Sequence, residues 1–288
     1  MVKNFLSIFK IRIGMLISFS AVVGYIVAEK GTPSFPRIFL LAILTLMASA
    51  GAGAYNQYYD RDIDAVMKRT DNRPLPSGGV RLTHGVAFAG IFLIFLSVIV
   101  AFFTFNYVVS LHLFLGAFVY AVIYTVWLKR RSWINIIIGG LSGSFAVLAG
   151  GASASPGFCL PPILLAIVLF FWTPSHFWSF AIVHKEDYQK VGIPMLPVII
   201  DNYKSALFIL LNTLFLFISS LLPIFFGHLG LIYGVIAVCT GAFFIGRNLQ
   251  LLINPTKEIA WKNFKASIIY LSIIFIAVIV DISLSSKW

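Results

Sequence analysis

Early in the chain, three residues that can bind a cation recur at four-residue spacing: Asn56, Asp60 and Asp64. On an α-helix this spacing places the three side chains on one face. Their oxygens suit Mg²⁺, which binds one or two protein carboxylates and fills its other positions with water and substrate phosphate oxygens. A divalent cation would also remove the repulsion between carboxylates four residues apart. The sequence therefore predicts an Mg²⁺ site.

Two arginines follow the acidic motif, also four residues apart. Guanidinium groups match pairs of phosphate oxygens, so Arg69 and Arg73 are candidates for binding a phosphate-bearing substrate, before Pro74 ends any helix. Asp62 lies about 200° around the helix from Asp60 and is expected to pair with an arginine instead. The simpler alternative is a charged loop whose acidic and basic side chains pair with one another. That alternative leaves the regular acidic spacing unexplained.

A second polar group lies between residues 172 and 197. Glu186 and Asp187 are predicted to bind a second Mg²⁺ on the other side of a diphosphate, as in two-metal sites. His176 lies inside an apolar segment, where it has two equal interpretations: a hydrogen bond to a neighbouring helix or a functional contact. Its closeness to the acidic pair slightly favours function.

Long apolar segments must position both groups. The chain has 288 residues, is 60% hydrophobic and 11% charged, and has a mean hydropathy of +0.96. A soluble domain of this composition would expose large apolar surfaces to water, so we expect an integral membrane protein. A helix needs about 20 apolar residues to cross a bilayer. The segments of that kind are 12–29, 37–57, 83–104, 107–127, 134–151, 161–184, 204–227, 229–250 and 265–283.

The predicted architecture is a single all-α transmembrane domain over residues 1–288, a polytopic protein with nine membrane helices. The first helix resembles a signal peptide, but Ala28-Glu29-Lys30 is a poor cleavage site, so we expect it to be retained. With the N-terminus inside, all but three of the 21 Lys and Arg residues fall in cytoplasmic segments, the exceptions being Lys30, Arg37 and Lys287. The positive-inside rule therefore predicts an N-in, C-out orientation.

The distribution of Lys and Arg residues also indicates which binding partners to expect. The net charge of +11 reflects basic residues spread over membrane loops, where an anionic leaflet attracts them, so no nucleic-acid partner is expected. A secondary transporter is the more distant alternative. Transporters place charged groups near the bilayer midplane, whereas the predicted spans here are almost free of carboxylates.

The acidic motif after the second of nine helices, with a second acidic motif after the sixth, resembles the UbiA-type intramembrane prenyltransferases. More narrowly, the segments Tyr-Asp-Arg-Asp-Ile-Asp (59–64), Trp-Thr-Pro-Ser-His-Phe-Trp (172–178) and Pro-Met-Leu-Pro (194–197) resemble the heme-prenylating members of that family. The resemblance covers nearly the whole chain. The chain departs from the family pattern at Ile11, where proline is usual, and at Ser175 and Glu186, where proline and aspartate are common.

This resemblance implies a UbiA-like helical bundle that transfers a farnesyl group from farnesyl diphosphate to a vinyl group of heme B, with Mg²⁺ as cofactor and heme as substrate. Arg12 and Lys129 would join the arginines at the leaving diphosphate, and Tyr124 would offer an aromatic face to the allylic cation. Core packing is the simpler role of any such aromatic ring. His176 and His184 are candidates for contacting the heme.

The resemblance also implies a place in the cell: the inner membrane of a bacterium, in contact with lipid, with the active site on the cytoplasmic side. The product would pass to a downstream heme-modifying enzyme or to the assembly of a terminal oxidase. The nearer alternative is a prenyltransferase for an aromatic acceptor such as a quinone precursor or a chlorin. Such an enzyme would share the Asp motifs but lack the Trp-Thr-Pro-x-His-Phe-Trp pattern.

Overall fold

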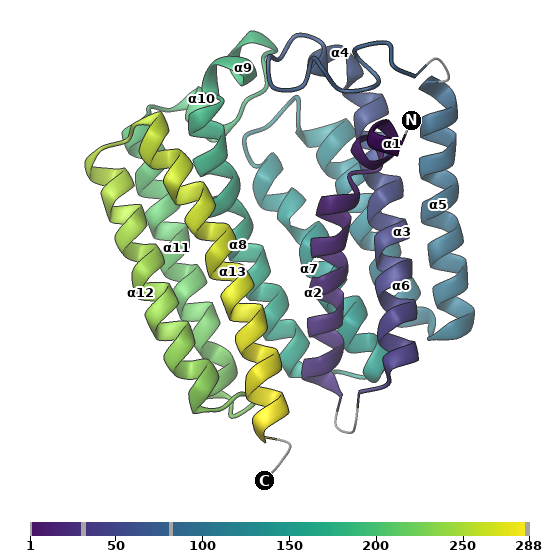
Figure 1. The fold of residues 1–288 in the computed structure, drawn as a ribbon. Helices are drawn as coiled ribbons and strands as arrows, with labels where there is room; N and C mark the ends of the chain where they lie inside the picture. The colour runs from purple at the N-terminus through teal and green to yellow at the C-terminus, as the bar shows by residue number, and fades with distance from the viewer. Residues whose placement is uncertain (1, 30–32, 81–82, 286–288) are drawn as a thin grey trace.

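The computed structural model describes residues 2–29, 33–80 and 83–285, and this part of the chain is helical without β-strands (Figure 1). Lys30 and Lys287 lie outside the described residues. The elements are α1 (Val2–Ile8), α2 (Ile11–Ala28), α3 (Phe35–Tyr59), α4 (Arg61–Asp64), α5 (Thr83–Thr104), α6 (Tyr107–Phe118), the π-helix η1 (Val119–Leu128), α7 (Asn135–Ala154), α8 (Leu160–Val183), α9 (Lys185–Lys190), α10 (Leu196–Ile199), α11 (Asn202–Phe225), α12 (Leu231–Ile253) and α13 (Lys257–Ser285).

Within the described residues, nine helices are long and apolar enough to span a membrane, and this confirms the predicted all-α polytopic fold. The predicted and observed bounds agree to within a few residues, except at the start of α13. This helix begins at Lys257, whereas hydropathy placed its start at residue 265. The polar first turns stay helical because Glu258 pairs with Lys262 at 2.6 Å and the buried Asn263 donates to the Ser179 hydroxyl at 2.9 Å.

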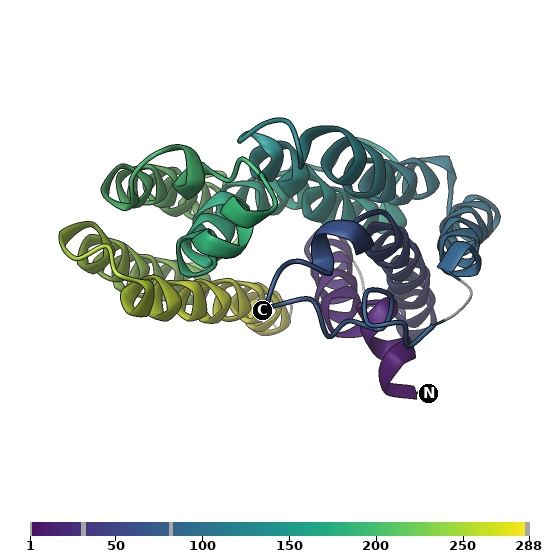
Figure 2. The same ribbon diagram turned by 90° about the horizontal axis from the view of Figure 1, so that it is seen from above.

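The spanning helices pack around two large hydrophobic clusters, and α2 and α7 contribute side chains to both. Seen from above, the C-terminal helices lie on the left and the N-terminal helices on the right (Figure 2). Helices α2 and α7 approach each other at glycines. A Cβ on Gly150 would lie 1.9 Å from the Ala21 carbonyl oxygen, and one on Gly24 would lie 2.1 Å from that of Val147. Only glycine permits this contact.

The long connections and the short helices α4, α9 and α10 gather at one end of the bundle (Figure 1). Two of these connections share a single hydrophobic core. Ile63 and Met67 from the first pack in the same cluster as Tyr188, Ile193 and Met195 from the second. Burial of these side chains therefore joins two segments that are more than 100 residues apart in sequence into one cap over the helix ends.

The fourth spanning helix changes from α to π at Val119, which the sequence did not predict. The amide of Lys129 donates to the Tyr124 carbonyl at 2.8 Å, and the Thr125 hydroxyl donates to the Tyr120 carbonyl at 2.8 Å. The wider turn of a π-helix aligns residues four to five apart, so side chains at 120, 125 and 129 face α3. π-Helical segments are rare and frequently mark functional sites.

Candidate active site

The last turn of α3 presents the predicted metal ligands. The helix is interrupted at Asp60, where the backbone angles are φ −88° and ψ 3°, and continues as α4. Its four-residue hydrogen bonding persists, since the Asp60 amide donates to the Asn56 carbonyl at 2.9 Å and the Asp64 amide to the Asp60 carbonyl at 2.8 Å. All three side chains are buried, with exposed fractions of 3%, 0% and 1% for Asn56, Asp60 and Asp64.

Cations from three other segments neutralise this buried group. Lys129, just after η1, contacts Asp60 Oδ2. Arg73 lies 2.5 Å from Asp64 Oδ2, and Lys10 donates to Asn56 Oδ1 at 2.5 Å. Buried carboxylates are stable only when paired or coordinated, so these cations balance a charge that would otherwise oppose folding.

Lys10 is a site residue that the sequence analysis missed. It occupies the break between α1 and α2 with a left-handed backbone (φ 48°, ψ 41°), and it also contacts the Tyr120 hydroxyl at 3.0 Å. Burial, with a smaller effect of the nearby cations Arg73 and Lys129, lowers the pKa of Lys10 to about 7. Arg12, the predicted residue, is exposed.

Thr125 is a second residue that sequence reasoning missed. Its hydroxyl accepts a hydrogen bond from Asn56 Nδ2 at 2.9 Å, and the same amide donates to Asp60 Oδ2 at 2.8 Å. These bonds turn Asn56 Oδ1 towards Lys10. A lone threonine in an apolar helix carries no signal in sequence, so only the π-helical register could have revealed it.

The donor set fits a Mg²⁺ ion. Among the described residues no three His, Cys, Asp or Glu side chains group as metal ligands, so the protein supplies two carboxylates, Asp60 and Asp64, with the Asn56 amide. Asp60 Oδ1 is buried without a hydrogen bond, which leaves a carboxylate oxygen available to a ligand. Mg²⁺ typically takes such a sparse protein set and completes its shell with phosphate oxygens and water.

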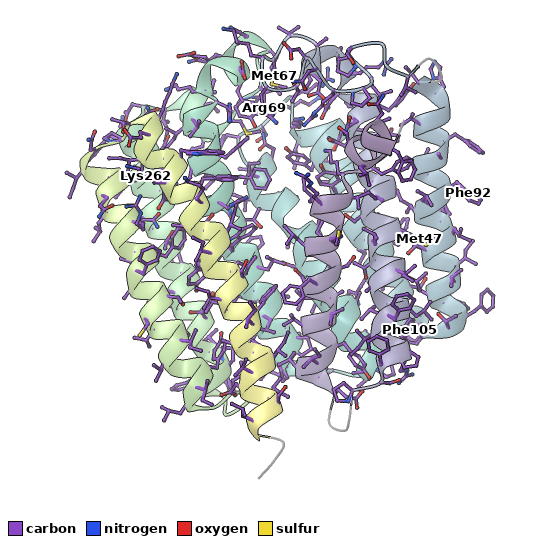
Figure 3. All side chains as sticks on the ribbon, in the orientation of Figure 1. Met47, Met67, Arg69, Phe92, Phe105 and Lys262 are labelled. Atoms are coloured by element: carbon purple, nitrogen blue, oxygen red, sulfur yellow. The ribbon has the colours of Figure 1, made fainter. Side chains whose placement is uncertain are left out.

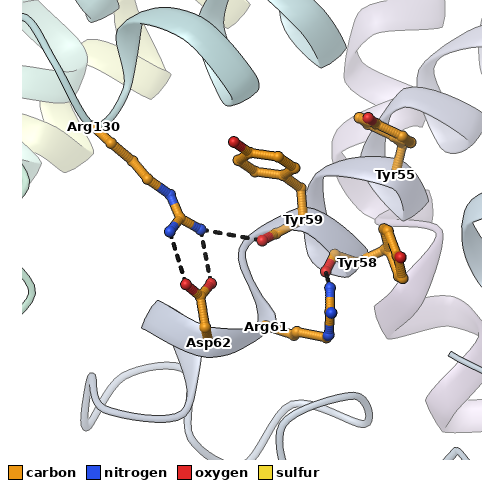
Figure 4. A pocket seen from close by; sticks show the side chains of 6 residues that line it. All are labelled: Tyr55, Tyr58, Tyr59, Arg61, Asp62 and Arg130. Carbon is orange, nitrogen blue, oxygen red and sulfur yellow. Dashed lines mark hydrogen bonds and ion pairs between the residues drawn. The ribbon is translucent and has the colours of Figure 1, made fainter.

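Asp62 points away from this group, as predicted, and pairs with Arg130. Both carboxylate oxygens of Asp62 lie 2.7 Å from the guanidinium, which also donates to the Tyr59 carbonyl at 3.1 Å (Figure 4). The hydrogen bonds from Arg130 lower the pKa of Asp62. Arg130 is also 3.7 Å from Asp60 Oδ1, so the pair holds a further cation beside the buried Asp60 carboxylate. A cavity of about 520 Å³ adjoins this pair.

Glu186 and Asp187, the second acidic pair, lie in different environments. Asp187 is 8% exposed and neighbours the buried Tyr188, whereas the Glu186 side chain is 73% exposed and binds Lys257 at 2.6 Å. Burial raises the pKa of Tyr188, and the cations Arg69 and Arg73 act against that rise. Asp187 is therefore buried in the cap, whereas Glu186 lies at the surface.

Arg69 lies under the cap (Figure 3). Its guanidinium is 5.2 Å from the centre of the Phe180 ring, and its Nε is buried without a hydrogen bond. His184 is half-buried, with its ring 4.4 Å from that of Phe180. Burial lowers the pKa of His184, and the charge of Arg69 lowers it further. The guanidinium of Arg69, with its unpaired Nε, and the imidazole of His184 thus lie beside the same aromatic ring.

His176 is buried between aromatic rings in the middle of the bundle. It stacks on Trp172 at 4.2 Å and on Phe264 at 4.4 Å, and its Nδ1 is 2.7 Å from the Ser267 hydroxyl on α13. This confirms the interhelical hydrogen bond, which was one of its two interpretations. The described residues offer no second partner, so Nε2 remains for a functional contact.

Tyr124 is half-buried on η1, beside the metal-ligand group. Its ring stacks on that of Tyr120, with centroids 5.6 Å apart, and Lys129 Nζ is 6.0 Å from its centre. Two stacked phenol rings therefore adjoin the buried carboxylates. Such rings present the electron-rich faces that attract cations.

The chain is similar in sequence to known prenyltransferases. Residues 17–277 match the UbiA prenyltransferase family. The chain is 46% identical to protoheme IX farnesyltransferase 1 of Paramagnetospirillum magneticum, over 97% of this chain and 98% of that protein. It is 41% identical to protoheme IX farnesyltransferase 1 of Cenarchaeum symbiosum, over 97% of this chain and 95% of that protein.

Solved structures share the fold at low sequence identity. A digeranylgeranylglyceryl phosphate synthase superposes with a TM-score of 0.81 at 22% identity, covering 98% of both chains. A UbiA homologue from Archaeoglobus fulgidus, bound to GPP and Mg²⁺, superposes with a TM-score of 0.71 at 16% identity, covering 96% of this chain and 99% of that one. These similarities show a common helical bundle.

Proposed function

The chain belongs to the UbiA prenyltransferase family, and we propose that it transfers the farnesyl group of farnesyl diphosphate to a vinyl group of protoheme IX (heme B), giving heme O and diphosphate. The relatives that carry the farnesyltransferase name match nearly the full length of the chain. The observation that carries the chemistry is the buried group of Asn56, Asp60 and Asp64, opposed by cations from separate segments.

In the proposed reaction, the bond between C1 of the farnesyl group and the diphosphate oxygen breaks first. The farnesyl carbon then bonds to the terminal vinyl carbon of heme, a water oxygen bonds to the inner vinyl carbon, and the second water proton is released. The costly step is the first, because negative charge develops on the leaving diphosphate. Groups that are fixed in place before that charge develops lower the barrier most.

Asn56, Asp60 and Asp64 would hold Mg²⁺, with the buried Asp187 as the candidate from the second motif. Mg²⁺ bound there would neutralise charge on the leaving diphosphate. Glu186 is a weaker candidate because it binds Lys257 at the surface.

The cations of the site would bind the phosphate oxygens directly. Lys10, Arg73 and Lys129 now pair with the ligand side chains, and Arg69 has a buried nitrogen without a hydrogen bond. When a metal occupies the carboxylates, these donors are free to turn to the diphosphate. Charge-assisted hydrogen bonds of this kind are about twice as strong as neutral ones.

Aromatic rings below the site would shield the allylic cation from water. The stacked pair of Tyr120 and Tyr124 adjoins Lys129, and electron-rich ring faces stabilise cations. For the acceptor, His176 offers Nε2 to the heme, and His184 lies half-buried near the cap. A single weak contact suits heme as a substrate, which must leave after the reaction.

The proposal includes a location. The cap with the acidic motifs would face the cytoplasm, with the N-terminus inside, in the inner membrane of a bacterial cell, because most basic residues lie at that end. The product, still embedded in lipid, would pass to a downstream heme-modifying enzyme or to terminal oxidase assembly.

Product analysis by mass spectrometry tests this function. Detergent-purified protein is incubated with heme B, farnesyl diphosphate and Mg²⁺, beside the variants Asp60→Asn and Asp64→Asn. Asp71→Asn is the matched control, since Asp71 is exposed in the same connection. We expect farnesylated heme from native protein and control, and a loss of about 10²- to 10³-fold in the two site variants.

The acceptor is tested in parallel reactions. Unmodified heme together with prenylation of an aromatic acid or a chlorin would favour the aromatic-acceptor alternative and leave the diphosphate site in place. Full activity of Asp60→Asn would contradict the site itself.

A further inference from the structure

A basic groove lies between α12 and α13 at the end of the bundle that carries the cap. Its volume is about 330 Å³. Lys262, one of its residues, is near the upper end of α13 (Figure 3). The groove is lined by Phe243, Arg247, Lys262, Lys265, Ala266 and Ile269. None of these residues belongs to the active site described above.

The residues that line the groove lie on one face of α12 and one face of α13. Phe243 and Arg247 are four residues apart on α12, and the residues from α13 recur at intervals of three and four, so each helix contributes one face.

The groove is strongly basic. Three of its six residues are cationic and none is acidic. Lys262 is partly neutralised by Glu258 at 2.6 Å, and Arg247 donates to the neutral Gln250. Lys265 forms no ion pair with any described residue. The groove therefore presents uncompensated positive charge and is suited to an anion.

An apolar surface continues from these cations. Phe243 is 52% exposed and Ile269 is 53% exposed, and both lie within helices that span the membrane. A ligand for this surface therefore has an anionic head at the helix ends and an apolar body beneath it. A free inorganic anion would use only the cations, whereas a phospholipid matches both parts.

We propose that this groove binds an anionic phospholipid, with its headgroup phosphate on Arg247 and Lys265 and its acyl chains along Phe243 and Ile269. Basic pockets between membrane helices commonly bind such headgroups. The opposite face of α13 carries Phe264 and Ser267, which contact His176 in the bundle. A bound lipid would therefore hold in place the helix that positions this histidine.

Native mass spectrometry of the whole protein tests the proposal, with phosphatidylglycerol or phosphatidylcholine added to detergent micelles. The groove variant is Arg247→Gln with Lys265→Gln. The matched control is Lys190→Gln with Lys204→Gln, which removes two exposed charges at the same end. Size-exclusion chromatography and circular dichroism establish that each variant is folded.

We expect native protein and control to retain one phosphatidylglycerol in preference to phosphatidylcholine. The groove variant should bind it roughly 30-fold more weakly, because each basic residue contributes about fivefold. Equal retention by native protein and groove variant would overturn the proposal, as would equal binding of the two lipids. Complete displacement by millimolar inorganic phosphate would show a simple anion site and would also overturn it.

Discussion

The Lys10 ammonium group lies 2.5 Å from the Asn56 side-chain oxygen, although the two residues are 46 positions apart in the chain. Lys10 sits at the break between α1 and α2, and Asn56 lies in the last turn of α3. The contact therefore brings the start of the first spanning helix to the proposed metal ligands at the end of the second.

This contact leads to a prediction for Lys10→Gln. Because a charged hydrogen-bond donor is lost, kcat/KM for farnesyl diphosphate should fall about 10- to 100-fold. Arg12→Gln, at the exposed position assigned to this role by resemblance, should change it by no more than about twofold. Steady-state assays of product by mass spectrometry measure both. A larger loss in Arg12→Gln than in Lys10→Gln would restore the original assignment.

The ion pair of Asp62 and Arg130 predicts an indirect effect on catalysis. Asp62→Asn should lower activity about threefold to tenfold, because Arg130 loses the bidentate partner that holds it 3.7 Å from Asp60. The loss should be smaller than in Asp60→Asn. Equal losses in the two variants would instead place Asp62 among the metal ligands.

The pH dependence provides a second measurement on this pair. Hydrogen bonds from Arg130 lower the pKa of Asp62 below its ordinary value of 3.8. The ion pair therefore stabilises the folded protein fully above pH 3.8. This stabilisation is lost only as the pH falls through the lowered pKa of Asp62 in the folded state. Between about pH 5 and 8 the difference in the free energy of unfolding between native protein and Asp62→Asn should therefore stay constant. A difference that vanishes within this range would contradict the assignment.

Asp187 and Glu186 should differ sharply when each is neutralised. Asp187→Asn should raise the Mg²⁺ concentration needed for half-maximal activity and reduce activity about 10-fold or more, because this carboxylate is buried in the cap and is the proposed ligand from the second motif. Glu186→Gln, which loses only a surface ion pair with Lys257, should change activity about twofold at most. Mg²⁺ titration of each variant after treatment with a chelator measures the difference. Equal effects would support the predicted acidic pair.

Asp281 should contribute to stability without contributing to catalysis. Its carboxylate accepts hydrogen bonds from the amides of Gly230 at 2.6 Å and Tyr233 at 3.2 Å, and so caps the N-terminus of α12 from α13. Asp281→Ala leaves these amides unpaired and should lower the free energy of unfolding by about 1 to 3 kcal/mol. Thermal unfolding in detergent measures the loss.

Asp281→Asn is the matched comparison, since it keeps an acceptor oxygen and should unfold at an intermediate temperature. Activity of both variants below the unfolding transition should match that of the native protein. A loss of activity without a change in the unfolding temperature would contradict the structural role.

Much of the fold was predictable because lipid imposes a simple rule. Each span must be a continuous apolar helix, so hydropathy alone located the nine candidate membrane helices in the described part of the chain. The start of α13 was the largest error. Its first turns are polar but remain helical through the pair of Glu258 and Lys262 and the buried Asn263. Hydropathy measures apolar content and therefore does not detect ion pairs or buried hydrogen bonds.

The sequence by itself determined the spacing of Asn56, Asp60 and Asp64 and the separation of Asp62 from them, because both follow from the local period of one helix. Residues brought in from other segments depended on the tertiary structure. Lys10 reaches Asn56 through the packing of α2 on α3, and Thr125 faces it only because η1 is π-helical. Local periodicity carries no information about distances between helices, so packing alone decided which cations and hydroxyls complete the site.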